Sequence, residues 1–267
     1  MSEELYHEVI GSGPVIAFIP GIAATTRYFH DRVLPLAACH QLVLVDPLGF
    51  GRSPKPWTTY SIDRHLAELR RVFAKFETLT LVGHSLGARM AVAYAARFPD
   101  QVSRLLLLSL PYFGPGDDGG SGALAYFRSR GSGYRALWTN PIVAALTCVI
   151  SRRLFGWLLP HFAGDLPADV VEDSMTHTWR SSTSTLWEVL YRHDISTDVA
   201  RLRTGLPVTL VHGDRDASAP VEHVRALAAA HPSWILVELS GCDHNPMLRH
   251  SVEVCGIIDA RCPPRTK

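Results

Sequence analysis

The sequence predicts an α/β fold in which a mostly parallel central sheet is flanked by helices and carries an inserted helical cap. Short apolar runs alternate with segments of helical periodicity through the first 110 residues. Runs that are apolar on both faces and separated by helices are typical of a parallel sheet covered on both sides. The alternation stops near Pro111 and resumes near Pro207, which indicates an insertion into one α/β domain.

Six strands are predicted from apolar runs that end in turn residues. Pro20-Gly21 ends the first run, and Asp46-Pro47 ends the second. The predicted strands are Val15–Ile19, Gln41–Val45, the run that begins at Leu79, Arg104–Leu108, Pro207–His212 and Trp234–Glu238.

Four helices are predicted between and after these strands from spacing near 3.6 residues. In the first of them Ile62, Leu66 and Leu69 share one face. The predicted helices are Ser61–Phe76, Ala88–Phe98, Val221–Ala230 and Met247–Ala260.

The segment 112–200 contains no convincing strand and is rich in aromatic and leucine residues. We therefore predict a core formed by residues 1–111 and 201–267, with 112–200 as a helical cap. A cap over a site at the sheet edge would wall an apolar pocket. Arg180 and His193 are polar residues within it, and a solvated helix face is favoured over contact with a substrate carboxylate.

Composition excludes several classes of protein. The formal net charge is +1 and no long basic run occurs, which argues against a nucleic-acid partner. No apolar stretch is long enough to span a bilayer, so no integral membrane segment is expected. The five cysteines form no C-x-x-C pair, so we expect neither a metal site nor a disulfide framework, and a cytoplasmic location is predicted. No cofactor is expected, and the oligomeric state is left open, with a homodimer as one alternative.

The most informative motif is Gly83-His84-Ser85-Leu86-Gly87, which follows an apolar strand and precedes a helix. On so tight a turn, the residues two positions before and two positions after the serine must be nearly free of side chains. This geometry lifts the Ser85 hydroxyl to where a base can reach it. The motif therefore predicts a nucleophile elbow.

A serine nucleophile needs a base, and the base needs an acceptor that fixes its tautomer. In open α/β sheets such groups lie on loops at the carboxyl ends of the strands. His244 is in the loop after the last strand, and two aspartates, Asp214 and Asp216, are in the loop after the strand before it. His84 is expected to point away from Ser85, and His212 is interpreted as structural.

The chain order Ser, Asp, His resembles that of the α/β-hydrolase superfamily, specifically serine hydrolases with a helical cap domain. The resemblance rests on the elbow, the loops around Asp216 and His244, the segment Pro20–Ala24 and the segment Asp46–Ser53. It covers nearly the whole predicted core. In similar proteins the acid commonly lies three residues past the loop glycine, which implies Asp216; Asp214 then holds the turn, and Asp243 ranks third.

The resemblance also implies an oxyanion hole made of two backbone N–H groups. One belongs to Leu86, at the first turn of the helix after the serine. The other comes from the loop after an early strand, where Ile22 is preferred and Ala23 is the alternative. The segment Asp46–Ser53 is interpreted as a structural loop.

The expected activity is cofactor-free hydrolysis of carboxylic esters of apolar acyl or cyclic substrates through an acyl-enzyme. A serine argues against epoxide hydrolases and haloalkane dehalogenases of this superfamily, which carry Asp at the elbow. A carbon–carbon bond hydrolase of the ring-cleavage type is the alternative enzyme, although Asp243–Pro246 lacks the Trp that often follows the histidine there. A non-hydrolytic role as a small-molecule receptor, lyase or cyclase is a further alternative, because fold does not dictate function.

Overall fold

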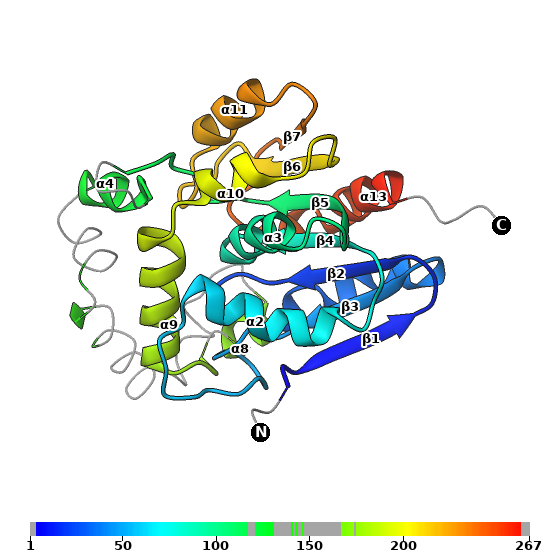
Figure 1. The fold of residues 1–267 in the computed structure, drawn as a ribbon, viewed down its shortest axis with the longest axis horizontal. Coiled ribbons are helices and arrows are strands. Elements are labelled where there is room, and N and C mark those ends of the chain that lie inside the picture. Colours follow the sequence, from blue (N-terminus) through cyan, green and yellow to red (C-terminus); the bar gives the residue numbers. More distant parts are fainter. Residues whose placement is uncertain are drawn as a thin grey trace.

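A computed structural model gives the structure of the protein, and it describes residues 4–116, 121–130, 140, 142–143, 146, 167–173 and 175–262. Its centre is a seven-stranded sheet in the order β1-β3-β2-β4-β5-β6-β7 (Figure 1). Only the β1–β3 pair is antiparallel; every other neighbouring pair in this sheet is parallel. The predicted α/β fold class is confirmed. The strands are β1 (His7–Gly11), β2 (Val15–Ile19), β3 (Gln41–Val45), β4 (Leu79–His84), β5 (Val102–Leu108), β6 (Val208–Gly213) and β7 (Ile235–Leu239).

The two faces of the sheet are covered because alternate residues of each buried strand point to opposite sides. In β2, Ala17 and Ile19 pack with one apolar cluster, and Ile16 and Phe18 pack with the other. Each fully buried aliphatic or aromatic side chain contributes about 1.5–3 kcal/mol. The first cluster includes residues of α2 (Ile62–Phe73), α3 (Leu86–Arg97) and α11 (Val221–Ala230). The second includes residues of η1 (Thr26–Tyr28), α1 (His30–Val33), η2 (Leu34–Ala38) and α13 (Ser251–Arg261).

Several elements differ from the sequence prediction, among them the short helices η1, α1 and η2 between β2 and β3, which were not expected. No strand was expected before Val15, yet β1 pairs with β3 at the edge of the sheet. The helix α2 ends at Phe73 rather than Phe76. The single closing helix expected over Met247–Ala260 is instead two helices, α12 (Pro246–Arg249) and α13, because His250 between them has φ −131° and ψ 40°, outside the helical region.

The segment between β5 and β6 is helical wherever an element is described in it. Its helices are α4 (Ala123–Arg128), α8 (Ala168–Asp173), α9 (Trp179–Thr185), the π-helical segment η3 (Leu186–Arg192) and α10 (Ile195–Arg201). In Figure 1, α4, α8 and α9 lie on the side toward which the carboxyl end of β2 points. The division into core and cap at residues 111/112 and 200/201 stays a prediction. The aromatic and leucine residues of 112–200 that lie outside the described residues include Tyr134, Leu137, Trp138 and Leu154–Phe162.

A buried arginine joins α3 to this segment. The guanidinium of Arg89 donates to the carbonyls of Val189 at 2.9 Å, Pro111 at 2.8 Å and His193 at 2.5 Å. These bonds satisfy a cation that is fully shielded from solvent. Across the described ranges, none of the helices combines the length and apolar character that a bilayer crossing needs.

Candidate active site

Ser85 occupies a strained turn between β4 and α3, with φ 53° and ψ −123°. Such a conformation costs about 1–3 kcal/mol and persists only where the surroundings hold it. A Cβ on Gly83 would lie 2.5 Å from the carbonyl oxygen of Gly87, and a Cβ on Gly87 would overlap the carbonyl oxygens of Ile19 and Pro20. The glycines of the motif are therefore required by close backbone contacts on both sides of the serine.

The structure brings the three predicted side chains together in one chain of hydrogen bonds. The distance from Ser85 Oγ to His244 Nε2 is 2.8 Å, and the distance from His244 Nδ1 to Asp216 Oδ2 is 2.7 Å. The serine follows β4, the aspartate follows β6 and the histidine follows β7, so all three lie at the carboxyl edge of the sheet. Such an arrangement can move a proton from a hydroxyl to an imidazole.

The Asp216 carboxylate is buried and held at both oxygens. Its Oδ1 accepts from the backbone N–H groups of Ser218 at 2.9 Å and Ala219 at 2.8 Å. Its Oδ2 faces His244 and also His212, whose Nε2 is 3.4 Å away. Burial alone would raise the pKa of Asp216, but the hydrogen bonds from His212 and His244 outweigh burial and hold this pKa well below its usual range. The carboxylate therefore stays ionised.

The two competing aspartates lie elsewhere. Asp214 is exposed and its Oδ1 accepts from the N–H of Gly241 at 2.7 Å, which is the role predicted for a turn residue. Asp243 accepts from the N–H of Asn245 at 2.8 Å and pairs with Arg249 at 3.1 Å. Neither carboxylate has a hydrogen bond to His244 among the described contacts.

His84, which was expected to point away from Ser85, supports the loop that carries His244. Its Nε2 donates to the backbone carbonyl of His244 at 2.8 Å, and its ring stacks on Tyr28 at 4.4 Å between centroids. Burial, and then the neighbouring His244, lower the pKa of His84 to about 3, so the ring is neutral. His84 and His244 are 160 residues apart in sequence, so no local pattern predicts this contact.

His212 was interpreted as structural, and its side chain is fully buried beside Asp216. Its Nε2 donates to the carbonyl of Ala219 at 2.5 Å, in the same loop that supplies N–H donors to Asp216. His212 therefore fixes this loop, and the same Nε2 lies 3.4 Å from the Asp216 carboxylate.

The segments expected to supply the oxyanion donors lie against Ser85. Leu86 is the first residue of α3, so its N–H has no acceptor within the helix. The loop after β2 approaches so closely that a Cβ on Gly21 would lie 3.1 Å from the Ser85 Cβ. Ala23 in this loop has φ 57°, a left-handed conformation that is uncommon for alanine.

Ser85 and His244 open into a cavity of about 210 Å³. Its described lining is mainly apolar, with a few polar groups from Ser218 and Asn245. The apolar lining residues include Ile22, Ala24, Phe127, Val170, Leu186 and Leu190.

Arg180 and His193 are not among the described lining residues. Arg180 donates to the carbonyl of Thr58 at 3.1 Å and stacks on Trp57. His193 is 2.5 Å from Asp198 with its side chain only 17% exposed, so the interpretation as a solvated residue was wrong for His193.

Cys242 lies near this site, and its thiol is not a competing nucleophile. Burial, together with the charges of Asp243 and Asp216, raises the pKa of the thiol to about 12. The four described cysteines are all free, and Cys148 lies outside the described residues. Cys242 is thus a buried packing residue, as predicted.

The chain was compared with known protein families, with known sequences and with solved structures. The family model described as "alpha/beta hydrolase fold" matches residues 14–251. An uncharacterized protein of Mycobacterium tuberculosis is 28% identical over 257 residues, which cover 89% of this chain and 72% of that protein. The "probable lysophospholipase BODYGUARD 5" of Arabidopsis thaliana is 24% identical over 92% of this chain and 61% of its own length. An esterase structure from Exiguobacterium antarcticum superposes with a TM-score of 0.74 at 18% identity, covering 97% of this chain and 95% of the esterase.

Proposed function

The chain belongs to the alpha/beta hydrolase fold family, and we propose that it is a serine hydrolase that cleaves carboxylic esters of apolar acyl or cyclic substrates. The observation that carries the proposal is the chain of short hydrogen bonds from Ser85 through His244 to Asp216. It supplies a nucleophile, a base and an orienting carboxylate in one place.

In the proposed reaction, Ser85 Oγ attacks the ester carbonyl carbon and His244 Nε2 takes the hydroxyl proton. Asp216 accepts the Nδ1–H of His244, which fixes the tautomer and stabilises the imidazolium. The N–H groups of Leu86 and Ile22 hold the oxyanion of the tetrahedral intermediate. His244 then protonates the leaving alcohol as the C–O bond breaks. Water attacks the acyl-enzyme by the same route and releases the acid.

The apolar cavity supports the substrate class. Its described walls are mainly aliphatic and aromatic side chains, and no Lys, Arg, Asp or Glu is among the described lining residues. An uncharged acyl group or ring gains about 0.8 kcal/mol for each buried CH₂, whereas a charged acyl group would lose hydration without a partner.

A panel of p-nitrophenyl esters of increasing acyl length tests the proposal, together with a fluorophosphonate probe and peptide mapping. We expect turnover of neutral esters and a single labelled serine, Ser85, with both lost in S85A. Labelling with negligible turnover across the panel would favour a receptor, lyase or cyclase. Decay of a coloured ring-cleavage dienoate without ester turnover would favour a carbon–carbon bond hydrolase.

We also propose a cytoplasmic location, which the free thiols of Cys39, Cys242, Cys255 and Cys262 support.

A further inference from the structure

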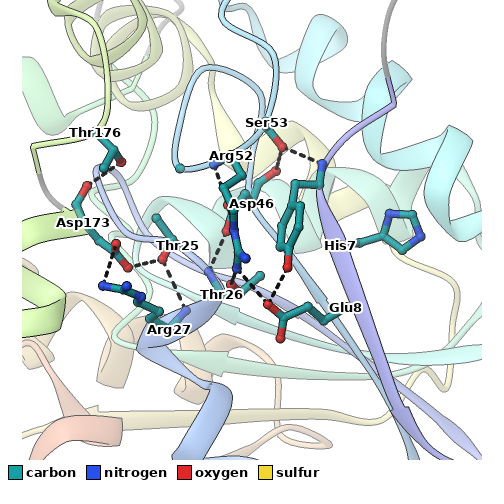
Figure 2. A network of polar contacts seen from close by, with 12 residues as sticks. His7, Glu8, Thr25, Thr26, Arg27, Asp46, Arg52, Ser53, Asp173 and Thr176 are labelled. Atoms are coloured by element: carbon teal, nitrogen blue, oxygen red, sulfur yellow. Dashed lines mark hydrogen bonds and ion pairs between the residues drawn. The ribbon is translucent and has the colours of Figure 1, made fainter.

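The loop expected to supply the Ile22 donor continues into a turn that two carboxylates hold from opposite sides (Figure 2). On one side the Asp46 Oδ1 accepts from the N–H of Thr26 at 2.7 Å. On the other side the hydroxyl of Thr25 donates to Asp173 Oδ2. The same hydroxyl accepts from the N–H of Arg27 at 3.2 Å, so both its donor and its acceptor capacity are used.

The two carboxylates come from different parts of the chain. Asp46 directly follows β3 and therefore belongs to the sheet. Asp173 is the last residue of α8, in the segment inserted between β5 and β6. Its side chain is only 12% exposed and also pairs with Arg27 at 3.4 Å. The insertion thus supplies one of the two anchors of the turn.

The anchored turn lies two residues after a strained position. Ala23 has φ 57°, and the N–H of Ala24 bonds to the carbonyl of Gly21 at 3.3 Å. A left-handed alanine persists only where neighbouring contacts fix the chain on both sides. On the N-terminal side the loop is fixed by β2, and on the C-terminal side by the bonds of Thr25 and Thr26.

The helix that carries Asp173 also forms part of the cavity wall. Val170, one turn earlier on α8, lines the cavity together with Ile22. A displacement of α8 would therefore open the cavity wall and remove the Thr25 anchor at the same time.

We infer that Asp173 is a positioning residue for the loop that carries Ile22, and that it acts through the Thr25 hydroxyl. The packing of α8 against η1 and the completion of the oxyanion hole are then one event. This inference rests on the proposed function for its kinetic consequence. Asp173 does not touch the substrate; it holds the segment whose N–H group stabilises the transition state. A donor displaced by about 1 Å reduces turnover on the order of 100-fold.

The kinetic test compares T25V and D173A with T25S, D173N and E172Q. Thr25→Val keeps the shape of the side chain and removes the donor, so kcat should fall roughly 10- to 100-fold while KM changes less than about threefold. Thr25→Ser restores the hydroxyl, and Asp173→Asn keeps an acceptor for it, so both should stay within about threefold of wild type. Among the described contacts Glu172 forms only an exposed pair with Arg27 at 3.5 Å, so E172Q is the matched control and should retain wild-type kcat.

Amide hydrogen exchange provides a readout that does not depend on ester turnover. We expect T25V and D173A to speed exchange at residues 22–26 at least about tenfold, with α3 amides unchanged. Unchanged exchange in this loop, or equal loss of kcat in T25V and T25S, would overturn the inference. A wild-type protein that hydrolyses no ester would instead refute the proposed function, and the exchange result would still decide the role of Asp173.

Discussion

Replacing Asp216 by asparagine changes the proton position on His244 while preserving the shape of the side chain. The Oδ1 site of Asp216 faces two backbone N–H donors, from Ser218 and Ala219. The amide oxygen of the new side chain must take this site, because an NH₂ group there would face two donors. The NH₂ group then faces His244 Nδ1, which has to be an acceptor, and the proton moves to Nε2 beside Ser85.

The size of the expected loss of kcat follows from this tautomer of His244. With Nε2 protonated, His244 cannot accept the Ser85 proton at the 2.8 Å contact. A base held in the wrong tautomer loses about 10⁴-fold in kcat, or about 5.5 kcal/mol at roughly 1.4 kcal/mol per tenfold.

The assay is kcat/KM for a p-nitrophenyl ester, measured beside D214N. Asp214 belongs to the same loop but bonds only the N–H of Gly241 among the described contacts, so D214N should keep activity within about threefold. Circular dichroism and the melting temperature establish that D216N is folded. A folded D216N enzyme that keeps more than about a tenth of wild-type kcat/KM would refute the tautomer argument.

Three further predictions concern stability and specificity. Gly87→Ala places a Cβ against the carbonyl oxygens of Ile19 and Pro20, so we expect a loss of roughly 3 kcal/mol or more in urea unfolding; an unchanged midpoint contradicts this. Burial lowers the pKa of His65 from 6.5 to about 3. The unfolded chain therefore binds the proton first, and the stability that this neutral imidazole contributes is present above pH 6.5 and is lost as the pH falls toward 3. Between pH 6.5 and 5, H65Q should lose roughly 2 kcal/mol less stability than wild type, whereas parallel pH profiles would contradict this pKa. Leu190→Trp narrows the cavity, so the ratio of kcat/KM for hexanoate to butyrate esters should fall about tenfold; an unchanged ratio would remove Leu190 from the acyl site.

The central sheet and the meeting of Ser85, Asp216 and His244 could be anticipated because their signals are local. Each lies in the turn or loop that follows an apolar run, and the carboxyl ends of parallel strands share one edge. The strand β1 was missed for a physical reason: His7–Gly11 is an edge strand with half-buried polar residues, so its sequence lacks a continuous apolar run. The break at His250 likewise depends on backbone conformation rather than on the apolar pattern.

The contacts around the three side chains could not be read from the sequence. His84 bonds the backbone carbonyl of His244, and Asp173 bonds Thr25, across separations of 160 and 148 residues. Neither pair lies on one helix face or one strand, so periodicity carries no information about them. Such contacts follow from the packing of whole elements, here the loop after β7 on β4 and α8 on η1.

In the proposed reaction Ser85 becomes covalently acylated during turnover. Rapid mixing with a p-nitrophenyl ester, acid quenching and peptide mass spectrometry measure this directly. We expect the peptide containing Ser85 to gain the mass of the acyl group and S85A to show neither acylation nor turnover. Ester hydrolysis with Ser85 unmodified throughout, or at the wild-type rate in S85A, would contradict the proposed reaction.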